Sequence, residues 1–318
     1  MQIFRIKTNF KLERMSNKDF PDEEYLQRLV ESNLQELFGL EFISGASNKE
    51  FVVKGQHQNF YIDTLAFDPQ TRSFVIIEYK KDKSFSVIDQ GYSYLSAMLN
   101  NKADFVLEYF EKLGKPLKRE QVDWSQPKII FVAREFTPYQ KGSIGFQDLP
   151  IELWEAELSN TALITFNQIK PPETQESITA ITRGEGIRKL SKEIKSYTEK
   201  DVVGKDPGLW ALYLSLKEQI NLLADDIDSY ATKYYVGFKF KNDWRVPITV
   251  NIRVKKLEIH LARSQPKDFK DPKSQVQYLK NSFKYFNQHI SYLTISHDKE
   301  LKYAIFIIKQ ALEKHNKI

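Results

Sequence analysis

The chain has 318 residues, of which 41% are hydrophobic and none is cysteine. The lack of cysteine excludes disulfides and thiolate metal sites and is typical of cytoplasmic proteins. No apolar run approaches the roughly 20 residues that a membrane-spanning helix needs. The length favours two domains of about 100–200 residues each. We therefore expect a folded cytoplasmic protein that makes no use of a membrane.

The formal net charge of +5 is unevenly distributed along the chain. From Asp201 to the end, 20 Lys and Arg residues and 13 Asp and Glu residues give +7. The preceding residues hold 27 basic and 29 acidic side chains, which gives −2. A basic second half fits a phosphate-binding surface, and it fits an ordinary solubilising surface equally well.

The first half of the chain is predicted to alternate helices and strands. Apolar side chains recur at helical spacing over 22–38, and a second helix is predicted over 86–99, where Asn100-Asn101 ends it. The turn-forming segment 68–73 joins two apolar runs, 60–67 and 74–80, into an antiparallel hairpin. Further strands are predicted at 49–54, 128–133, 151–154 and 162–166. This mixture indicates an α/β layer fold.

The second half begins after a predicted linker at 171–200, which opens with two prolines. We expect a larger α/β unit at 1–170 and a smaller α+β domain at 201–318. The predicted helices of the latter are 209–223, 272–286 and 299–314, and its predicted strands are 234–241, 246–253, 257–261 and 290–295. Asn242-Asp243 is a candidate hairpin turn.

Three charged residues interrupt the apolar strands of the predicted hairpin, and charges are rarely buried unless they are paired or bind metal. If Phe67 lies opposite Phe74, paired residue numbers sum to 141, and Asp63 falls across from Glu78. Like charges in that position repel, and a divalent cation would relieve the repulsion. Lys80 projects from the same face as Glu78. The alternative is a metal-free network in which Lys80 pairs with both carboxylates.

These residues resemble the motif of the PD-(D/E)xK nuclease superfamily, with Ile62 in place of the motif's proline, then Asp63, and Glu78-Tyr79-Lys80 on the next strand. Upstream, Glu31 lies in a helix before Leu37-Phe38-Gly39, as in the family's first helix. Downstream, Gln90 and Tyr94 have the Gln-x-x-x-Tyr spacing of RecB-like members. All four elements occur in family order within about residues 24–95.

The resemblance implies a restriction-endonuclease-like mixed sheet flanked by helices, and a Mg²⁺ site in which Mn²⁺ can substitute. Asp63 and Glu78 would be the principal ligands, with the Tyr79 carbonyl as a third. Glu31 would bind a second ion or position a water, or else it is a solvated helix residue. Lys80 would orient the attacking water or neutralise the phosphate. Two further residues would contact DNA or the water at the metal, or would only pack the helix on the sheet: Gln90 and Tyr94.

The second half resembles a domain of unknown function that occurs C-terminal to such nuclease-like halves, in proteins labelled predicted transport proteins. Basic and aromatic residues interleave in it, which suits nucleic acid. Val236, Phe238 and Phe240 alternate with lysines, however, and such alternation is typical of a half-buried strand whose aromatic side chains belong to the core. The candidate phosphate contacts are Lys239, Lys241, Arg245, Arg253, Lys255 and Lys256.

The sequence thus favours a magnesium-dependent nuclease acting on DNA, in repair or in restriction of foreign DNA. One alternative is an inactive nuclease fold that works as a nucleic-acid-binding or protein-interaction module. A third hypothesis, a transport accessory protein, rests only on the label given to proteins with a similar second half. The sequence leaves open whether the protein is a homodimer, which DNA strands it prefers, and whether it would cut internally or from ends.

Overall fold

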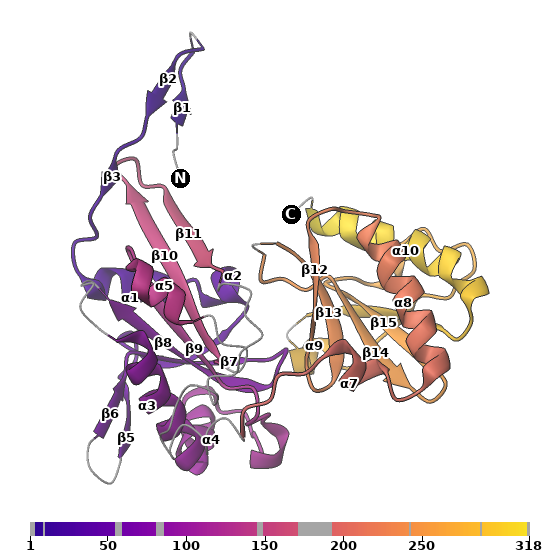
Figure 1. Ribbon diagram of the computed structural model, residues 1–318, viewed down its shortest axis with the longest axis horizontal. Coiled ribbons are helices and arrows are strands. Elements are labelled where there is room, and N and C mark those ends of the chain that lie inside the picture. Colours follow the sequence, from indigo (N-terminus) through magenta and orange to yellow (C-terminus); the bar gives the residue numbers. More distant parts are fainter. Residues whose placement is uncertain are drawn as a thin grey trace. The chain divides into compact units, whose positions relative to one another are not determined.

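The computed structural model describes residues 4–8, 10–54, 59–80, 86–144, 149–170, 193–241, 243–286 and 288–316. The chain divides into two compact units, Met1–Lys195 and Ser196–Ile318 (Figure 1). Each unit has its own hydrophobic core. Of the predicted linker at 171–200, residues 171–192 lie outside the described part of the chain.

A mixed sheet forms the centre of the first unit. Among the described residues it has seven strands, in the order β11-β10-β9-β8-β7-β4, with β3 beside β10. The pairs β8–β9 and β9–β10 are parallel, and the others are antiparallel. The strands are β3 Asn17–Lys18, β4 Glu41–Gly45, β7 Thr64–Asp68, β8 Ser73–Lys80, β9 Lys128–Ala133, β10 Ile151–Ser159 and β11 Ile164–Ile169.

Helices cover both faces of this sheet. Helices α1 (Glu23–Glu31) and α2 (Leu34–Phe38) pack on one face, and α3 (Val87–Asn100) and α4 (Lys102–Leu113) pack on the other. Alternate residues of β8 therefore enter two different cores, Tyr79 on the α1 side and Ile76 on the α3 side. The predicted α/β fold, a mixed sheet flanked by helices, is confirmed.

Two small hairpins and two short helical segments complete the described part of the first unit. Strand β1 (Phe4–Ile6) pairs with β2 (Leu12–Arg14), and β5 (Phe51–Lys54) pairs with β6 (Asn59–Ile62). The β1–β2 hairpin projects from the rest of its unit (Figure 1) and exposes large apolar side chains. The short helices are α5 Pro138–Ser143 and the 3₁₀ turn η1 Arg119–Gln121.

The predicted hairpin has the predicted register, but its first strand is interrupted. Thr64 pairs with Ile77 and Phe67 with Phe74, so paired residue numbers sum to 141 as expected. The run predicted as one strand at 60–67 is divided at Asp63, because β6 pairs with β5 whereas β7 pairs with β8 and β4. Asp63 therefore occupies the point where the chain passes from one sheet to the other.

The helix predicted at 22–38 is also divided. It breaks at Ser32 and Asn33, whose side chains donate hydrogen bonds of 2.8 Å to the carbonyls of Arg28 and Leu29. Such bonds compete with the helical backbone. The second piece, α2, ends at Gly39 in the left-handed region, with φ of 70°, where glycine is favoured. This break makes Glu31 the last residue of α1.

The second unit is a six-stranded antiparallel sheet among the described residues, in the order β12-β13-β14-β15-β17-β16. Helices α7 (Glu199–Val203), α8 (Pro207–Asn221) and α10 (Asp298–Asn316) pack on one face of it. Val236, Phe238 and Phe240 are buried there, so the predicted half-buried strand is confirmed. The strands are β12 Ile227–Ala231, β13 Tyr235–Phe240, β14 Ile248–Arg253, β15 Lys256–Ala262, β16 Gln277–Tyr278 and β17 Ile290–Ile295.

The helix predicted at 272–286 is wrong over most of its length. Only α9 (Ser282–Phe286) is helical, and η3 (Pro266–Asp268) and β16 occupy the sequence before it. Ser274 and Asn281 have φ of 52° and 63°, which an α-helix cannot contain. The Asp271 carboxylate also accepts a 2.8 Å hydrogen bond from the Val276 N–H and holds the loop in place.

The C-terminal helix α10 is amphipathic. Ala304, Ile307 and Ile308 are buried against the sheet, and charged side chains lie on the other side of the helix. This pattern is typical of a helix packed on a globular core. No helix in the described part of the chain combines the length and the apolar character needed to cross a membrane.

Gly91 allows α3 to lie close to the sheet, and replacing it tests this packing. A Cβ at this position would lie 2.3 Å from Ile151 Cδ1 and 3.6 Å from Phe131 Cε2. We expect Gly91→Val to lower the free energy of unfolding by about 1–3 kcal/mol in urea titrations, because overpacking displaces buried side chains.

Gly142→Val is the matched control, since no atom lies within 4 Å of its Cβ position. This helical substitution should change stability by less than about 0.5 kcal/mol. Equal effects of the two substitutions would contradict the close approach of α3.

Candidate functional site

Asp63 is held at the break between β6 and β7 by its neighbours on both sides. Its carbonyl accepts a 2.7 Å hydrogen bond from Gln27 Nε2 of α1. Its carboxylate Oδ2 accepts a 3.1 Å hydrogen bond from the backbone N–H of Tyr79 on β8. Extending the β7–β8 register by one residue puts Asp63 opposite Glu78. The two carboxylates therefore lie at the same end of adjacent strands.

Glu78 is buried at the C-terminal end of β8 and receives two hydrogen bonds on one oxygen. Lys80 Nζ lies 2.6 Å from Oε1, and Gln90 Nε2 of α3 donates to the same atom at 3.0 Å. Gln90 Nε2 also lies 3.4 Å from the Tyr94 hydroxyl, which donates to the Tyr61 carbonyl at 3.1 Å. The structure thus brings together five of the predicted site residues: Asp63, Glu78, Lys80, Gln90 and Tyr94.

The electrostatics of this cluster leave negative charge only partly compensated. Burial, together with the neighbouring charge of Glu78, raises the pKa of Asp63 from 3.8 to about 7, although the Tyr79 N–H and Lys80 act in the opposite direction. The second oxygen of Glu78, Oε2, is buried and has no hydrogen-bond partner among the described residues. Burial and the charge of Glu78 also raise the pKa of Tyr94. The pairing of Lys80 with Glu78 therefore does not neutralise both carboxylates.

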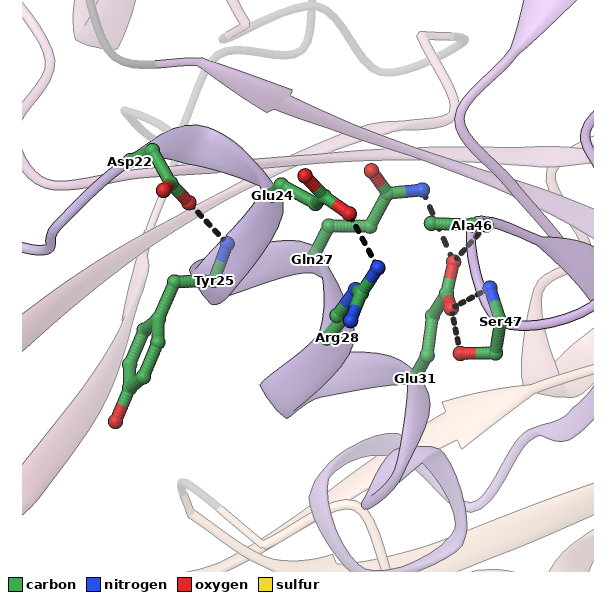
Figure 2. A network of polar contacts seen from close by, with 8 residues as sticks. All are labelled: Asp22, Glu24, Tyr25, Gln27, Arg28, Glu31, Ala46 and Ser47. Atoms are coloured by element: carbon green, nitrogen blue, oxygen red, sulfur yellow. Dashed lines mark hydrogen bonds and ion pairs between the residues drawn. The ribbon is translucent and has the colours of Figure 1, made fainter.

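Glu31 is buried at the end of α1 and uses both of its oxygens in hydrogen bonds (Figure 2). Oε1 accepts from Gln27 Nε2 at 3.0 Å, from the Ala46 N–H at 3.0 Å and from Thr64 Oγ1 at 2.7 Å. Oε2 accepts from the N–H of Ser47 at 3.0 Å and from its hydroxyl. The alternative that Glu31 is a solvated helix residue is wrong.

Tyr79 connects the Glu31 network to β8 on the face of the sheet opposite to Glu78. Its ring is fully buried on the α1 side, and its hydroxyl lies 3.3 Å from Thr64 Oγ1. Burial raises the pKa of Tyr79 well above its usual value, and the charges of Glu31, Asp63 and Glu78 add to this effect. The Tyr79 carbonyl, the predicted third ligand, belongs to the same backbone segment whose N–H binds Asp63.

Sequence reasoning missed three residues of the Glu31 network. Gln27 bridges Glu31 Oε1 and the Asp63 carbonyl, and so couples α1 directly to the candidate site. The spacing of Gln27 and Glu31, four apart on one helix face, was a signal that could have indicated the pair. Thr64 and Ser47 carried no comparable signal, because their contacts depend on how the strand and loop pack. Glu31 therefore anchors the loop at 46–47 and the start of β7 to α1.

Two carboxylates and a backbone carbonyl are a donor set that suits Mg²⁺, which binds through one or two carboxylates and keeps several waters. Glu78 Oε2, which has no hydrogen-bond partner in the described part of the chain, and the raised pKa of Asp63 fit a cation at this place. No group of three or more His, Cys, Asp or Glu side chains arranged for a metal occurs among the described residues. The structure thus keeps Glu31 out of the Asp63–Glu78 set.

The six basic residues predicted in the second unit do not form one cluster. Strands β13 and β14 are antiparallel, with Phe238 opposite Ile248 and Tyr235 opposite Asn251. This pairing places one group at the end of β13 and in the loop that follows, and the other at the opposite end of the sheet, in the β14–β15 turn. The first group is Lys239, Lys241 and Arg245, and the second is Arg253, Lys255 and Lys256.

Several of these basic residues are already paired with acids. Arg245 binds Asp243 through Nε and a terminal nitrogen at 2.8–3.0 Å. Arg253 Nε lies 3.1 Å from Glu258 Oε1. These two arginines are therefore held within the unit, whereas Lys255 and Lys256 are exposed in the turn. Lys241 is exposed and lies 3.9 Å from Asp228.

The raised pKa of Asp63 predicts a pH-dependent effect on stability. Between about pH 4 and 7 the folded protein holds a proton on Asp63 that the unfolded chain has released. The stability that protonated Asp63 contributes is therefore fully present below pH 4 and is lost as the pH rises through 7. We expect Asp63→Asn in EDTA to be more stable than wild type at pH 8, by on the order of 2 kcal/mol. Urea titrations at several pH values measure this, and the difference should shrink towards pH 4.

The exposed Asp104→Asn on α4 is the control and should show no such pH-dependent difference. A stability difference for Asp63→Asn that is the same at pH 4 and pH 8 would contradict the assigned environment of Asp63.

Removing the Glu31 carboxylate should destabilise the first unit. Glu31→Ala leaves the Ala46 and Ser47 N–H groups and the Thr64 hydroxyl without their acceptor. We expect a loss of about 2–4 kcal/mol in the free energy of unfolding, because buried donors without partners are costly. Glu24→Ala, on the exposed side of the same helix, removes only a surface pair with Arg28 and should cost less than about 0.5 kcal/mol. Wild-type stability of Glu31→Ala would refute the anchoring role.

Comparison with known proteins identifies relatives but no activity. Residues 198–315 match a domain of unknown function, DUF5655. An uncharacterized protein of Haemophilus influenzae is 38% identical over 316 residues, which cover 98% of this chain and all of the relative. No solved structure matches. The chain therefore belongs to the same family as the uncharacterized Haemophilus influenzae protein and has a DUF5655 domain as its C-terminal part.

Proposed function

We propose that the protein is a magnesium-dependent nuclease that hydrolyses DNA, with its site at Asp63 and Glu78. The observation that carries the proposal is the incomplete compensation of this carboxylate pair. Asp63 has a pKa of about 7, and Glu78 Oε2 is buried without a partner among the described residues, although Lys80 lies beside Glu78. A bound divalent cation would favour the ionised form of Asp63 and would give Glu78 Oε2 a partner. The flanking residues also resemble the nuclease motif.

In this proposal Asp63, Glu78 and the Tyr79 carbonyl hold Mg²⁺, with Mn²⁺ as a substitute. The ion would supply a bound water of lowered pKa and would neutralise charge at the phosphate. Lys80 would contact the scissile phosphate or orient the attacking water. Its ammonium group lies 2.6 Å from Glu78 Oε1, beside the proposed metal ligands. A lysine is suited to such a point contact with phosphate.

Gln90 and Tyr94 support the pair from α3. Gln90 donates to Glu78 Oε1 and so fixes the orientation of that carboxylate. Tyr94 anchors α3 to the carbonyl of Tyr61, two residues before Asp63. Gln27 and Glu31 fix the Asp63 backbone from the other face, which makes them positioning residues in this proposal. The site is thus held from both layers of helices, as preorganised catalysis requires.

The second candidate function is an inactive nuclease fold that binds nucleic acid or a protein. The Lys80–Glu78 ion pair favours it, because a lysine can satisfy part of the site without metal. The basic second unit would then carry the function alone. The transport role of the inherited label has no observation in its favour, so we do not propose it.

The nuclease proposal predicts metal-dependent cleavage of linear, circular or single-stranded DNA. With Mg²⁺ or Mn²⁺ present, wild type should cut at least one of these substrates, and EDTA should abolish cutting. Glu78→Gln and Lys80→Met should each lower the rate by roughly 100-fold or more, the scale on which loss of one charge-stabilising group acts. Cutting of circular DNA would identify an endonuclease.

Glu152→Gln is a matched control for these variants. Glu152 forms a 2.8 Å ion pair with Lys128 on neighbouring strands of the same sheet. In the parallel β8–β9 pair, Lys128 lies opposite Val75 whereas Lys80 lies opposite Ala133, so this ion pair is at the other end of the sheet. The control should keep the wild-type cleavage rate. Failure of folded wild type to cut any of the substrates with either metal would sink the nuclease proposal and favour the binding module.

A further inference from the structure

The sheet of the second unit has one face that carries polar and aromatic side chains in place of a hydrophobic core. Helices α8 and α10 lie together on one side of the sheet (Figure 1), where the apolar residues of β13 to β15 are buried. Side chains alternate along a strand, so the residues that lie between these apolar residues in each strand point to the opposite face of the sheet. That face includes Tyr230, Tyr235, Thr249, Asn251, His260 and Tyr292.

Tyr230 lies over the neighbouring strand at a glycine. It is paired with Gly237, and a Cβ at Gly237 would lie only 2.7–2.9 Å from two ring carbons and the hydroxyl oxygen of Tyr230. Any side chain larger than hydrogen would therefore displace the ring. The Lys239 ammonium is 5.5 Å from the centre of the same ring. The strand pairing thus places the Tyr230 ring at Gly237, with the flexible side chain of Lys239 carrying a cation over the ring.

Further ring-bearing residues continue in the same register row across the sheet. Gly237 pairs with Thr249, Thr249 with His260, and His260 with Tyr292. The rings of His260 and Tyr292 have their centres 6.1 Å apart. His260 is fixed by a 2.8 Å contact between its Nε2 and Glu258 Oε1. Tyr230, His260 and Tyr292 therefore lie along one line over strands β12, β15 and β17.

The charges on this face favour an anionic ligand. Lys239, Arg253 and Lys256 project from it, against two acids, Asp228 and Glu258. Glu258 is buried and is held by Arg253 and His260, so its charge is compensated within the sheet. The unit as a whole is strongly basic, with 20 Lys and Arg against 13 Asp and Glu from Asp201 onward.

We propose that this face binds a single strand of DNA, with bases stacked on Tyr230 and on the His260–Tyr292 pair and phosphates held by Lys239 and the exposed Lys256. The inference rests on the proposed nuclease function for its choice of DNA. A flat row of rings recognises unpaired bases, because only unstacked bases present their π-faces to a protein. Proteins usually hold a single strand with basic side chains that bind its phosphates, next to aromatic rings on which its bases stack. The aromatic row assigns single-stranded DNA as the preferred ligand of this unit.

Fluorescence anisotropy of a labelled dT oligomer of about 15 nucleotides tests this inference on the full chain. EDTA in the buffer prevents metal-dependent cleavage. Tyr230→Ala should weaken binding roughly 5- to 150-fold, the range for the loss of one stacked base, whereas Tyr230→Phe should keep wild-type affinity. Gly237→Val should act like Tyr230→Ala, because it displaces the ring. Lys239→Ala should lower the salt dependence of binding.

Phe306→Ala is the matched control, because Phe306 is an exposed aromatic residue on α10, the helix that packs on the other face of the sheet. It should bind the oligomer as wild type does. Undetectable binding by wild type, equal affinity of Tyr230→Ala and wild type, or tighter binding of duplex DNA would each overturn the inference. Cleavage by wild type in Mg²⁺ is measured separately. Binding that depends on Tyr230 without cleavage would contradict only the nuclease proposal, and cleavage without such binding would contradict only this inference.

Discussion

Two neighbouring carboxylates, the buried Glu78 near the end of β8 and the partly buried Asp63 just before β7, impose the strongest constraint on the first unit. Their repulsion and burial cost free energy, and the surrounding elements are arranged around them. Helix α1 holds the Asp63 backbone through Gln27 from one face. Helix α3 holds Glu78 through Gln90 from the other face, and Gly91 lets that helix approach the sheet. Both helical layers thus converge on one pair of side chains.

Glu31 differs from the Asp63–Glu78 pair in how completely its carboxylate is hydrogen-bonded, and this difference indicates different roles. Glu31 is a buried carboxylate whose oxygens all have donors, so it ties the loop at 46–47 and the start of β7 to α1. Glu78 is equally buried but leaves one oxygen without a described partner. Unsatisfied buried groups of this kind cluster where a protein uses them. This difference is why we assign the proposed chemistry to Asp63 and Glu78 and a positioning role to Glu31.

The sequence predicted the parts of the fold that depend on local patterns. The turn at 68–73 indicated the hairpin, and the register assumed for it, with Phe67 opposite Phe74, is the observed one. Strands β9 and β17 have the predicted bounds. The break at Asp63 was missed, because it arises when β6 pairs with a strand outside the main sheet. The partners of Glu31 were missed for the same reason, since tertiary packing brings them together. The split of the basic residues reflects strand direction, which a run of sequence does not reveal.

The most direct test of the carboxylate pair is calorimetric titration of Mn²⁺ into the metal-free protein at pH 7, in two buffers with different heats of ionisation. A cation at Asp63 and Glu78 should bind with release of protons, because it displaces the proton that a pKa of about 7 leaves on Asp63. Asp63→Asn should lose both the binding and the proton release. Absence of Mn²⁺ binding by wild type, or unchanged binding by Asp63→Asn, would contradict the account.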